Sequence, residues 1–236
     1  MRTEARASSV RFRVGLAALG LVFANTACGG GSLGSPVPIL DMDQAVLRAR
    51  RDNPFPTTSQ VIFQWSVREP DLRLEGMGVA RLQHPDRARL DLFMENGEAV
   101  LAVSLVEDQL RAREGTRLQV VPSPALLWAS LGVFRPGEGV TLLGAEAFDD
   151  DVFRLRYRLP DGDELRYELR SGRVTEVELR HEGNVTHRVA LNREREGELP
   201  KEATYRNLAS FSELKVTVET VERVDSHPAD IWYPAP

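Results

Sequence analysis

The sequence predicts a mainly β protein of the α+β class: an antiparallel, open half-barrel of about ten strands with a short helical lid over an apolar groove. Apolar residues alternate with polar or charged ones through most of the chain after residue 60, the period of strands with one buried face. Two-residue turn signals separate many of these segments. Two stretches instead carry the boundary signals of helices.

The first of these helices is predicted over residues 40–51, where the apolar residues share one face at helical spacing. Asp41 can cap the helix, and Gln44 stands three residues later, as in a capping box. Asn53 and Pro54 are expected to end it.

Four predicted strands follow this helix. Their apolar residues span Val61 to Val67, Leu72 to Leu82, Leu90 to Leu92 and Ala99 to Val106. Between the third and fourth strands, the pair Asn96-Gly97 is a strong signal for a two-residue β-hairpin turn.

The C-terminal half of the chain alternates more regularly. Its predicted strands span Phe153 to Leu159, Leu165 to Leu169, Val177 to Leu179, Val185 to Leu191 and Leu214 to Val218. The turn signals Asp161-Gly162, Ser171-Gly172 and Gly183-Asn184 separate the first four of them. The pattern predicts a meander of antiparallel strands, each apolar on one face and charged on the other.

A short apolar segment interrupts the strands and predicts the second helix, over residues 125–132. Ser123 can cap it, Pro124 suits its first turn and Gly132 suits its end. About ten strands must bury one apolar face each. Two short helices supply too little surface to fill so large a sheet, so we expect an apolar groove between the sheet and the helical lid.

The N-terminus predicts export. A basic segment and a short apolar run, Val14 to Ala24, precede the small residues Thr26-Ala27, as in a signal peptide. Cys28, the only cysteine, follows in a context that resembles a bacterial lipobox. We therefore expect a signal peptide at 1–27, a lipidated Cys28 with a flexible tether at 28–39, and the half-barrel domain at 40–236. An ordinary signal peptide with an incidental cysteine is the alternative.

Localisation and charge narrow the function further. Gly29 stands where some inner-membrane lipoproteins have Asp, which favours the outer membrane, facing the periplasm. Four of the 30 basic and one of the 35 acidic residues lie in 1–27, so the remainder has a net charge of −8. This balance argues against a nucleic-acid partner, because no concentrated basic face is available for phosphates.

The sequence predicts no enzyme, cofactor or metal site. It contains none of the common nucleophile, metalloprotease, phosphate-loop or dinucleotide motifs. His181 and His187 flank a turn and could face each other, but a third zinc ligand is not evident. The segments Asp149-Asp150-Asp151 and Asp161-Gly162-Asp163 lack the ligand spacing of a calcium loop.

Several segments together resemble the LolA/LolB lipoprotein-localisation family, and LolB more than LolA because LolB is itself a lipoprotein. They are Phe63-Gln64-Trp65, the segment from Arg87 to Gly97, the Pro, Leu, Trp and Gly residues of Pro122 to Gly132, and the ending Pro228 to Pro234. The resemblance covers most of residues 40–234. It implies a monomer that binds lipoprotein acyl chains and receives them from a soluble periplasmic LolA-like carrier, or inserts them at the outer membrane.

Seven residues are candidates for this function. The groove candidates are Phe63, Trp65, Leu126, Leu127 and Trp128. They could equally be core residues of a filled sheet. LolB proteins often have a protruding Leu in the loop that here begins at Met94, so Phe93 and Met94 are candidates for membrane or cargo contact.

Two other functions remain open at this point. A sensor of envelope lipids could use the same fold. A structural lipoprotein could instead have a filled core and dock a protein partner through a sheet edge.

Overall fold

The computed structural model describes residues 34–112, 121–148, 151–194 and 199–233. The predicted signal peptide, Cys28 and the first part of the predicted tether lie outside the described residues. Residues 33–236 form one compact unit. Within the described ranges, no helix has the length and apolar character that crossing a membrane requires.

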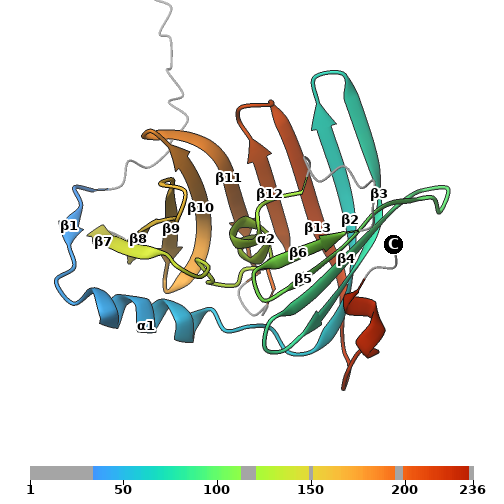
Figure 1. The fold of residues 1–236 in the computed structure, drawn as a ribbon, viewed down its shortest axis with the longest axis horizontal. Coiled ribbons are helices and arrows are strands. Elements are labelled where there is room, and N and C mark those ends of the chain that lie inside the picture. The colour runs from blue at the N-terminus through green and yellow to red at the C-terminus, as the bar shows by residue number, and fades with distance from the viewer. Residues whose placement is uncertain (1–33, 113–120, 149–150, 195–198, 234–236) are drawn as a thin grey trace, which may run out of the picture. The chain divides into compact units, whose positions relative to one another are not determined.

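Thirteen antiparallel strands form one sheet, which confirms the predicted open, mainly β half-barrel (Figure 1). The strands are β1 (Val37–Pro38), β2 (Ser59–Glu69), β3 (Leu72–Gln83), β4 (Arg87–Met94), β5 (Ala99–Val106), β6 (Gln109–Ala112), β7 (Thr141–Phe148), β8 (Val152–Arg158), β9 (Glu164–Arg170), β10 (Arg173–His181), β11 (Asn184–Asn192), β12 (Glu202–Asn207) and β13 (Ser212–Arg223). Their spatial order is β1-β7-β8-β9-β10-β11-β12-β13-β2-β3-β4-β5-β6, so β1 and β6 are the two edges.

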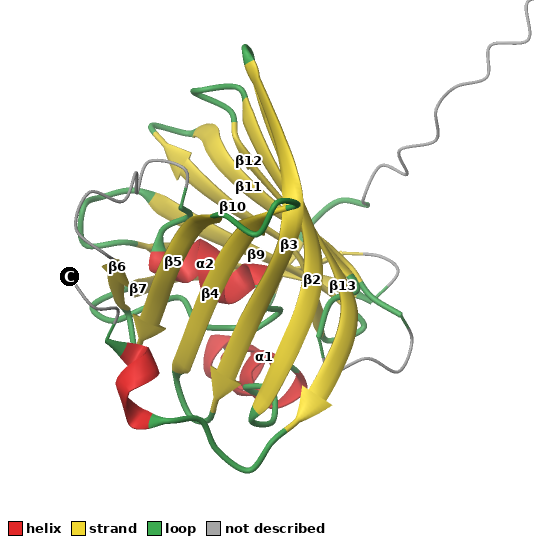
Figure 2. Ribbon diagram, turned by 90° about the vertical axis from the view of Figure 1, so that its right-hand side faces the viewer, coloured by secondary structure: helices red, strands yellow, loops and turns green. Residues whose placement is uncertain are grey.

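Among the described residues, two α-helices and a short 3-10 helix accompany the sheet: α1 (Met42–Asp52), α2 (Pro124–Ser130) and η2 (Ala229–Trp232). Figure 2 shows α2 inside the curve of the sheet and α1 near one end of it. The predicted cap of α1 is present, since the Gln44 amide donates to the Asp41 carboxylate at 3.0 Å.

Four strands were not individually predicted, and their sequences explain why. A register shift between Leu142 and Gly144 interrupts the alternation in β7. β12 has only Ala203 and Tyr205 as buried residues on its inner face. The remaining two, β1 and β6, have two and four residues, which is too short for a repeating pattern.

The concave face of the sheet holds two hydrophobic cores. The first joins α1 to strands β7–β12, and the second lies over strands β2–β5. Helix α2 contributes to both, because Leu126 and Ala129 pack in the first core while Leu127 and Trp128 pack in the second. The lid predicted from the sequence is therefore also the element that connects the two halves of the core.

The C-terminal segment covers part of the convex face of the sheet. Arg89 donates to the Ile231 carbonyl at 2.7 Å, and the Ser104 hydroxyl donates to the Trp232 carbonyl at 2.9 Å. The buried carboxylate of Asp91 is paired with Arg89 and with Arg81. These polar contacts fasten η2 to β4 and β5, on the side opposite the two cores.

Asn53 connects α1 to the β9–β10 turn and generates a prediction. Its side chain, only 2% exposed, donates to the carbonyls of Ala49 and Gly172 at 2.9 and 2.8 Å and accepts from the Val174 amide at 2.9 Å. Asn53→Ala leaves these buried groups without their partner, so we expect a loss of about 2 kcal/mol in the free energy of unfolding, measured in urea.

Asn184→Ala is the matched control for this prediction. Asn184 is exposed at the start of β11, and its replacement should change stability by no more than about 0.5 kcal/mol. Equal losses for the two variants would show that Asn53 has no special structural role.

Candidate functional site

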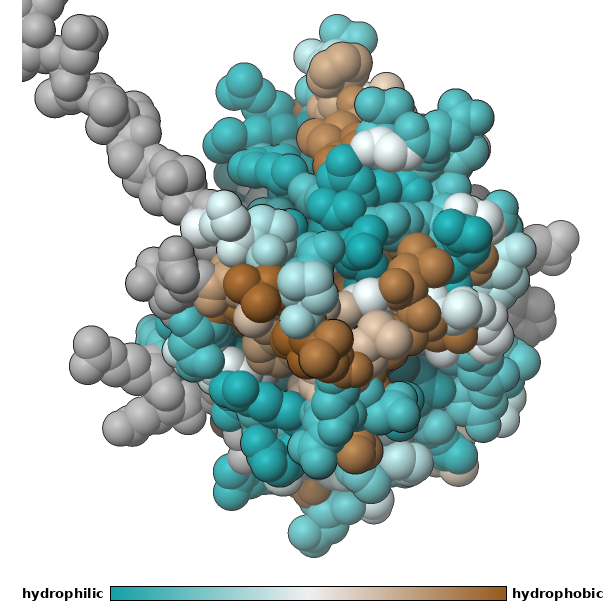
Figure 3. Space-filling view, turned by 90° about the vertical axis from the view of Figure 1, so that its left-hand side faces the viewer, coloured by the Kyte–Doolittle hydropathy of each residue, from teal (hydrophilic) through white to brown (hydrophobic). Residues whose placement is uncertain are grey.

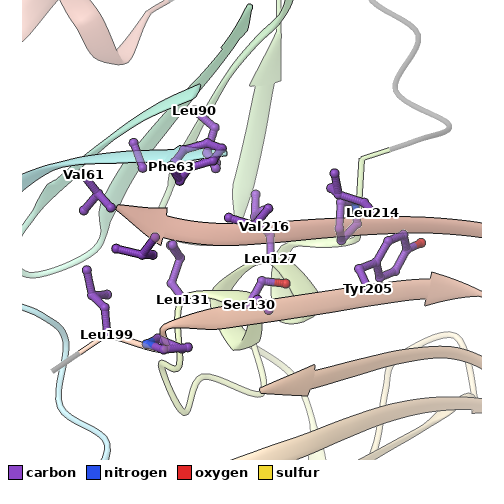
Figure 4. Close-up of a pocket in the computed structure, with 15 residues that line it drawn as sticks. Val61, Phe63, Leu90, Leu127, Ser130, Leu131, Leu199, Tyr205, Leu214 and Val216 are labelled. Carbon is purple, nitrogen blue, oxygen red and sulfur yellow. The ribbon is translucent and has the colours of Figure 1, made fainter. Parts of the chain in front are cut away.

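An apolar cavity of about 70 Å³ lies between α2 and the concave face of the sheet (Figure 4). Its lining is carbon almost throughout; the side-chain oxygens of Ser130 and Tyr205 are the exceptions among the described residues. The lining residues are Val61, Phe63, Ala80, Leu90, Pro122, Leu127, Ser130, Leu131, Leu199, Pro200, Ala203, Tyr205, Leu214, Val216 and Val218.

Strand register brings the sheet side of this lining together. In the pairing of β13 with β2, Val216 lies opposite Trp65 and Val218 lies opposite Phe63. Because side chains two residues apart share a face, Val61, Phe63, Leu214, Val216 and Val218 all point to the concave side. The alternation that predicted these strands thus also places their apolar residues in one wall.

Two glycines in β3 leave room for the aromatic residues of β2. A Cβ added at Gly78 would lie 2.3 Å from the Phe63 ring, and one added at Gly76 would lie 3.1 Å from the Trp65 ring. Both rings therefore lie close against the backbone of β3, and Phe63 forms part of the cavity wall.

Helix α2 is held by a hydrogen bond from one of its side chains and by another just past its end. The Trp128 indole donates to the Glu107 carbonyl at 2.8 Å. Past the end of the helix, Gly132 adopts a φ of +75°, and its carbonyl accepts from Arg193 at 3.1 Å. Burial lowers the pKa of Arg193 to about 10, so its guanidinium stays charged at neutral pH. These contacts hold the lid over the cavity with few hydrogen bonds.

The boundaries of α2 agree with the prediction in part. Pro124 occupies the first turn, and Gly132 has the positive φ that suits a residue after a helix end. Ser123 is the N-cap residue, but its side chain makes no capping hydrogen bond within the described structure. The backbone carbonyl of Ser123 instead accepts from the Leu127 amide at 2.8 Å.

Of the five predicted groove residues, two line the cavity and three do not. Phe63 and Leu127 line the cavity. Leu126 packs in the first core, away from the cavity, and Trp128 packs against Phe55 with ring centroids 5.5 Å apart. Trp65 is buried beside the cavity, where its indole donates to the Met77 carbonyl at 2.9 Å.

The lining also contains residues that the sequence did not single out. Leu214, Val216 and Val218 were predicted to share a strand face, so a signal for them existed. No periodic pattern pointed to Leu199 and Pro200, which enter from the segment before β12.

Phe93 and Met94, the candidates for membrane or cargo contact, lie on opposite faces of β4. Phe93 is half-buried on the convex face, opposite Met77 of β3. Met94 is half-buried against the second core. Their role in contact stays a prediction.

The most exposed large aromatic residue in the described structure is Phe211, in the β12–β13 turn. It is 81% exposed and has a φ of +55°, which is strained for a bulky side chain. Leu208 in the same turn and Leu72, where the neighbouring β2–β3 turn ends, are also exposed. Figure 1 shows both hairpins ending at the same end of the sheet. We call this end, with Leu72, Leu208 and Phe211, the apolar rim.

The two histidines that flank the β10–β11 turn have separate environments. The His181 ring lies 2.7 Å from the Asp163 carboxylate, and this hydrogen bond raises the pKa of His181. His187 stacks on Tyr205, and burial lowers its pKa. No group of three His, Cys, Asp or Glu in the described ranges has the arrangement of a metal site.

Comparison with known proteins identifies the fold. No family model and no curated protein matches the chain. Among solved structures, a LolA superfamily protein from Nitrosomonas europaea has 14% identity and a TM-score of 0.54, over 80% of this chain and 96% of that one. A domain from Vibrio parahaemolyticus, described as an outer membrane lipoprotein-sorting protein, has 10% identity and a TM-score of 0.55, over 80% and 94%. The chain has the LolA-like fold, as the resemblance predicted.

The close approach of Gly78 to Phe63 generates a prediction. Gly78→Ala places a Cβ against the buried Phe63 ring, which has to shift, so we expect a loss of about 1–3 kcal/mol in the free energy of unfolding in urea.

Gly144→Ala in β7 is the control, because its Cβ would meet the flexible end of Arg156 at 3.1 Å. That side chain can move aside, so the control should lose much less stability than Gly78→Ala. If the two variants unfold at the same urea concentration, Phe63 is not held as tightly as the structure indicates.

Proposed function

We propose that this chain is a membrane-anchored lipoprotein that binds acyl chains between α2 and the sheet, and that it receives or inserts lipoproteins at the periplasmic side of the outer membrane. The observation that carries the proposal is the apolar cavity under α2. Its described lining has no charged group, so a ligand must be recognised through burial of apolar surface alone. Acyl chains have this chemistry, since each buried CH₂ contributes about 0.8 kcal/mol.

The size of the cavity implies that α2 moves when a ligand enters. A volume of about 70 Å³ is under half of the roughly 150 Å³ that accommodates one benzene. An acyl chain is several times larger than benzene, so the structure corresponds to a closed state. Outward movement of Leu127 and Leu131 on the lid side, and of Leu199 in the segment before β12, would enlarge the space.

Release to a membrane follows from the same energetics. A cavity that buries fewer methylene groups than a bilayer loses its ligand to the bilayer when the two are in contact. The proposal therefore needs a surface that touches the membrane. The apolar rim supports this role, because Phe211 is held out into solvent in a strained backbone conformation. The predicted contact residues Phe93 and Met94 are less exposed.

Docking of a protein partner through a sheet edge is the alternative. In the described structure β1 pairs only with Glu146 and Ala147 of β7, and β6 pairs only with residues 103–106 of β5, so part of each neighbouring strand could still accept an added strand. Lipid sensing uses the same cavity. It is distinguished from transport by asking whether other lipoproteins lose their localisation when this chain is deleted.

Native mass spectrometry with lipid extraction tests the cavity. We expect residues 33–236, the compact unit that holds both cores, to carry an acyl ligand or to take up a fluorescent fatty acid. Ser130→Phe fills the cavity from the lid, so it should weaken uptake about tenfold, the equivalent of about two lost methylene contacts.

Ser66→Phe is the control for Ser130→Phe, because Ser66 lies on the other face of β2 and does not line the cavity. It should bind as the unmodified protein does. A clean ligand-free mass together with no uptake would overturn the lipid cavity and leave the docking protein as the better reading.

The apolar rim is tested by liposome co-sedimentation of the same residues. Phe211→Ser removes one exposed aromatic ring, and we expect the partition into neutral liposomes to fall about tenfold, in line with about 1.5 kcal/mol or more for burying such a side chain. Phe93→Ser in the same assay tests the contact predicted from the sequence.

Tyr233→Ser is the matched control, because Tyr233 is also an exposed aromatic residue but stacks under Arg111 on the convex side, 4.6 Å from the ring centroid. An equal loss in Phe211→Ser and Tyr233→Ser would mean that the rim has no special contact with lipid.

A further inference from the structure

A second and larger cleft lies between α1, the segment that follows α2, and β8. Its volume is about 540 Å³, within the roughly 300–1,000 Å³ of small-molecule sites. It shares no lining residue with the cavity under α2 in the described structure. Figure 3 shows that apolar side chains gather at the centre of the face that carries β1 and α1, framed by hydrophilic ones.

Apolar residues form about half of the walls of this cleft. Its apolar residues are Val46, Pro54, Phe55, Pro85, Val133, Phe134, Pro136, Val140 and Leu142. The Phe134 ring packs against Tyr167 at 4.8 Å and against Tyr157 at 6.2 Å between centroids. This aromatic cluster belongs to the first core, so one wall of the cleft is rigid.

Tyr157 brings a buried polar group to this wall. The residue is 4% exposed, and its hydroxyl has no hydrogen-bond partner within the described structure. Buried polar groups are normally paired, so an unpaired hydroxyl beside a cleft points to a missing partner. Burial raises the pKa of Tyr157 to about 12, so the hydroxyl keeps its proton and can donate it to an acceptor.

Arg50 brings a positive charge to the same cleft. The neighbouring cations of α1 are engaged, since Arg48 and Arg51 pair with Asp52. Across the cleft, Arg135 pairs with Asp108 at 2.7 Å. Arg50 has no ion pair with any described residue, although its charge acts on Tyr157 and opposes the rise in pKa of that hydroxyl.

Three acidic residues and a second arginine also line the cleft. Asp43 and Glu138 also line it; both are exposed, as Arg50 is, so water and salt screen all three charges. The carboxylate of Asp108 is occupied by Arg135. Arg50 is thus the unpaired cation of the described lining, and it stands near an unpaired hydroxyl donor.

We propose that this cleft binds a single-chain amphiphile with an anionic head group, a carboxylate or a phosphate. The head lies between the Arg50 guanidinium and the Tyr157 hydroxyl, and the chain lies along the apolar wall of Val46, Phe134, Val140 and Leu142. Both groups are donors, which suits an acceptor-only anion. The proposal does not depend on the proposed function, because it uses a different cavity.

Isothermal titration calorimetry of residues 33–236 tests this site with three probes: decanoate, decanol and acetate. Decanoate and decanol share one chain, so their difference in affinity reports the head group. We expect decanoate to bind about tenfold more tightly than decanol, the size of one charge-assisted hydrogen bond, and acetate to bind too weakly to detect.

Four variants test which residues produce the preference for decanoate over decanol. Arg50→Gln should abolish the preference for decanoate, and Tyr157→Phe should reduce it. Arg51→Gln, the same change one residue along α1, should preserve it, because Arg51 does not line the cleft. Ser130→Phe fills the cavity under α2 and should also preserve it, which separates this site from the proposed lipid cavity.

Four outcomes would overturn the proposal. Equal affinities of decanoate and decanol would show that the head group is not recognised. Acetate binding as tightly as decanoate would reduce the site to one for small anions, without recognition of a chain. Equal effects of Arg50→Gln and Arg51→Gln would indicate general attraction by charge. Loss of the preference in Ser130→Phe would place the ligand under α2 instead.

Discussion

The fold depends on one short helix, α2, which covers a large apolar surface on the concave face of the sheet. A curved sheet of thirteen strands exposes its concave face unless something packs there, and the seven residues of α2 reach the centre of that face. Leu126 faces one half of the core and Leu127 faces the other, so the two halves meet at this helix. The cavity lies under this helix, and the cleft is lined in part by the segment that follows it.

Sequence reasoning recovered the fold because its signals are local. Alternation marks a strand with one buried face, and it marked β2, β8 and β9 without any knowledge of their partners. It failed for β7, where a register shift between Leu142 and Gly144 moves the inward residues out of phase. The proline and glycine that bound α2 predicted that helix equally well.

The site was recovered less completely, for a physical reason. A short helix that is apolar all round carries no pattern to say which residues face which half of the core, so Leu127 and Leu126 could not be told apart. Leu199 lines the cavity and Tyr157 lines the cleft. Their positions depend on how distant strands curve towards the helices. The presence of Arg50 and Tyr157 in the lining of one cleft is likewise a product of the tertiary fold.

The open sheet has a consequence for crowding on a membrane surface. Unpaired edges of a sheet are templates on which neighbouring chains add strands, and close spacing of molecules favours such addition. Here β1 and β6 pair with only part of β7 and β5 in the described structure, so some of the outer backbone of these two strands is open to a neighbour. Because no strand closes the sheet, it can also widen or narrow between its edges, a freedom that a closed barrel lacks.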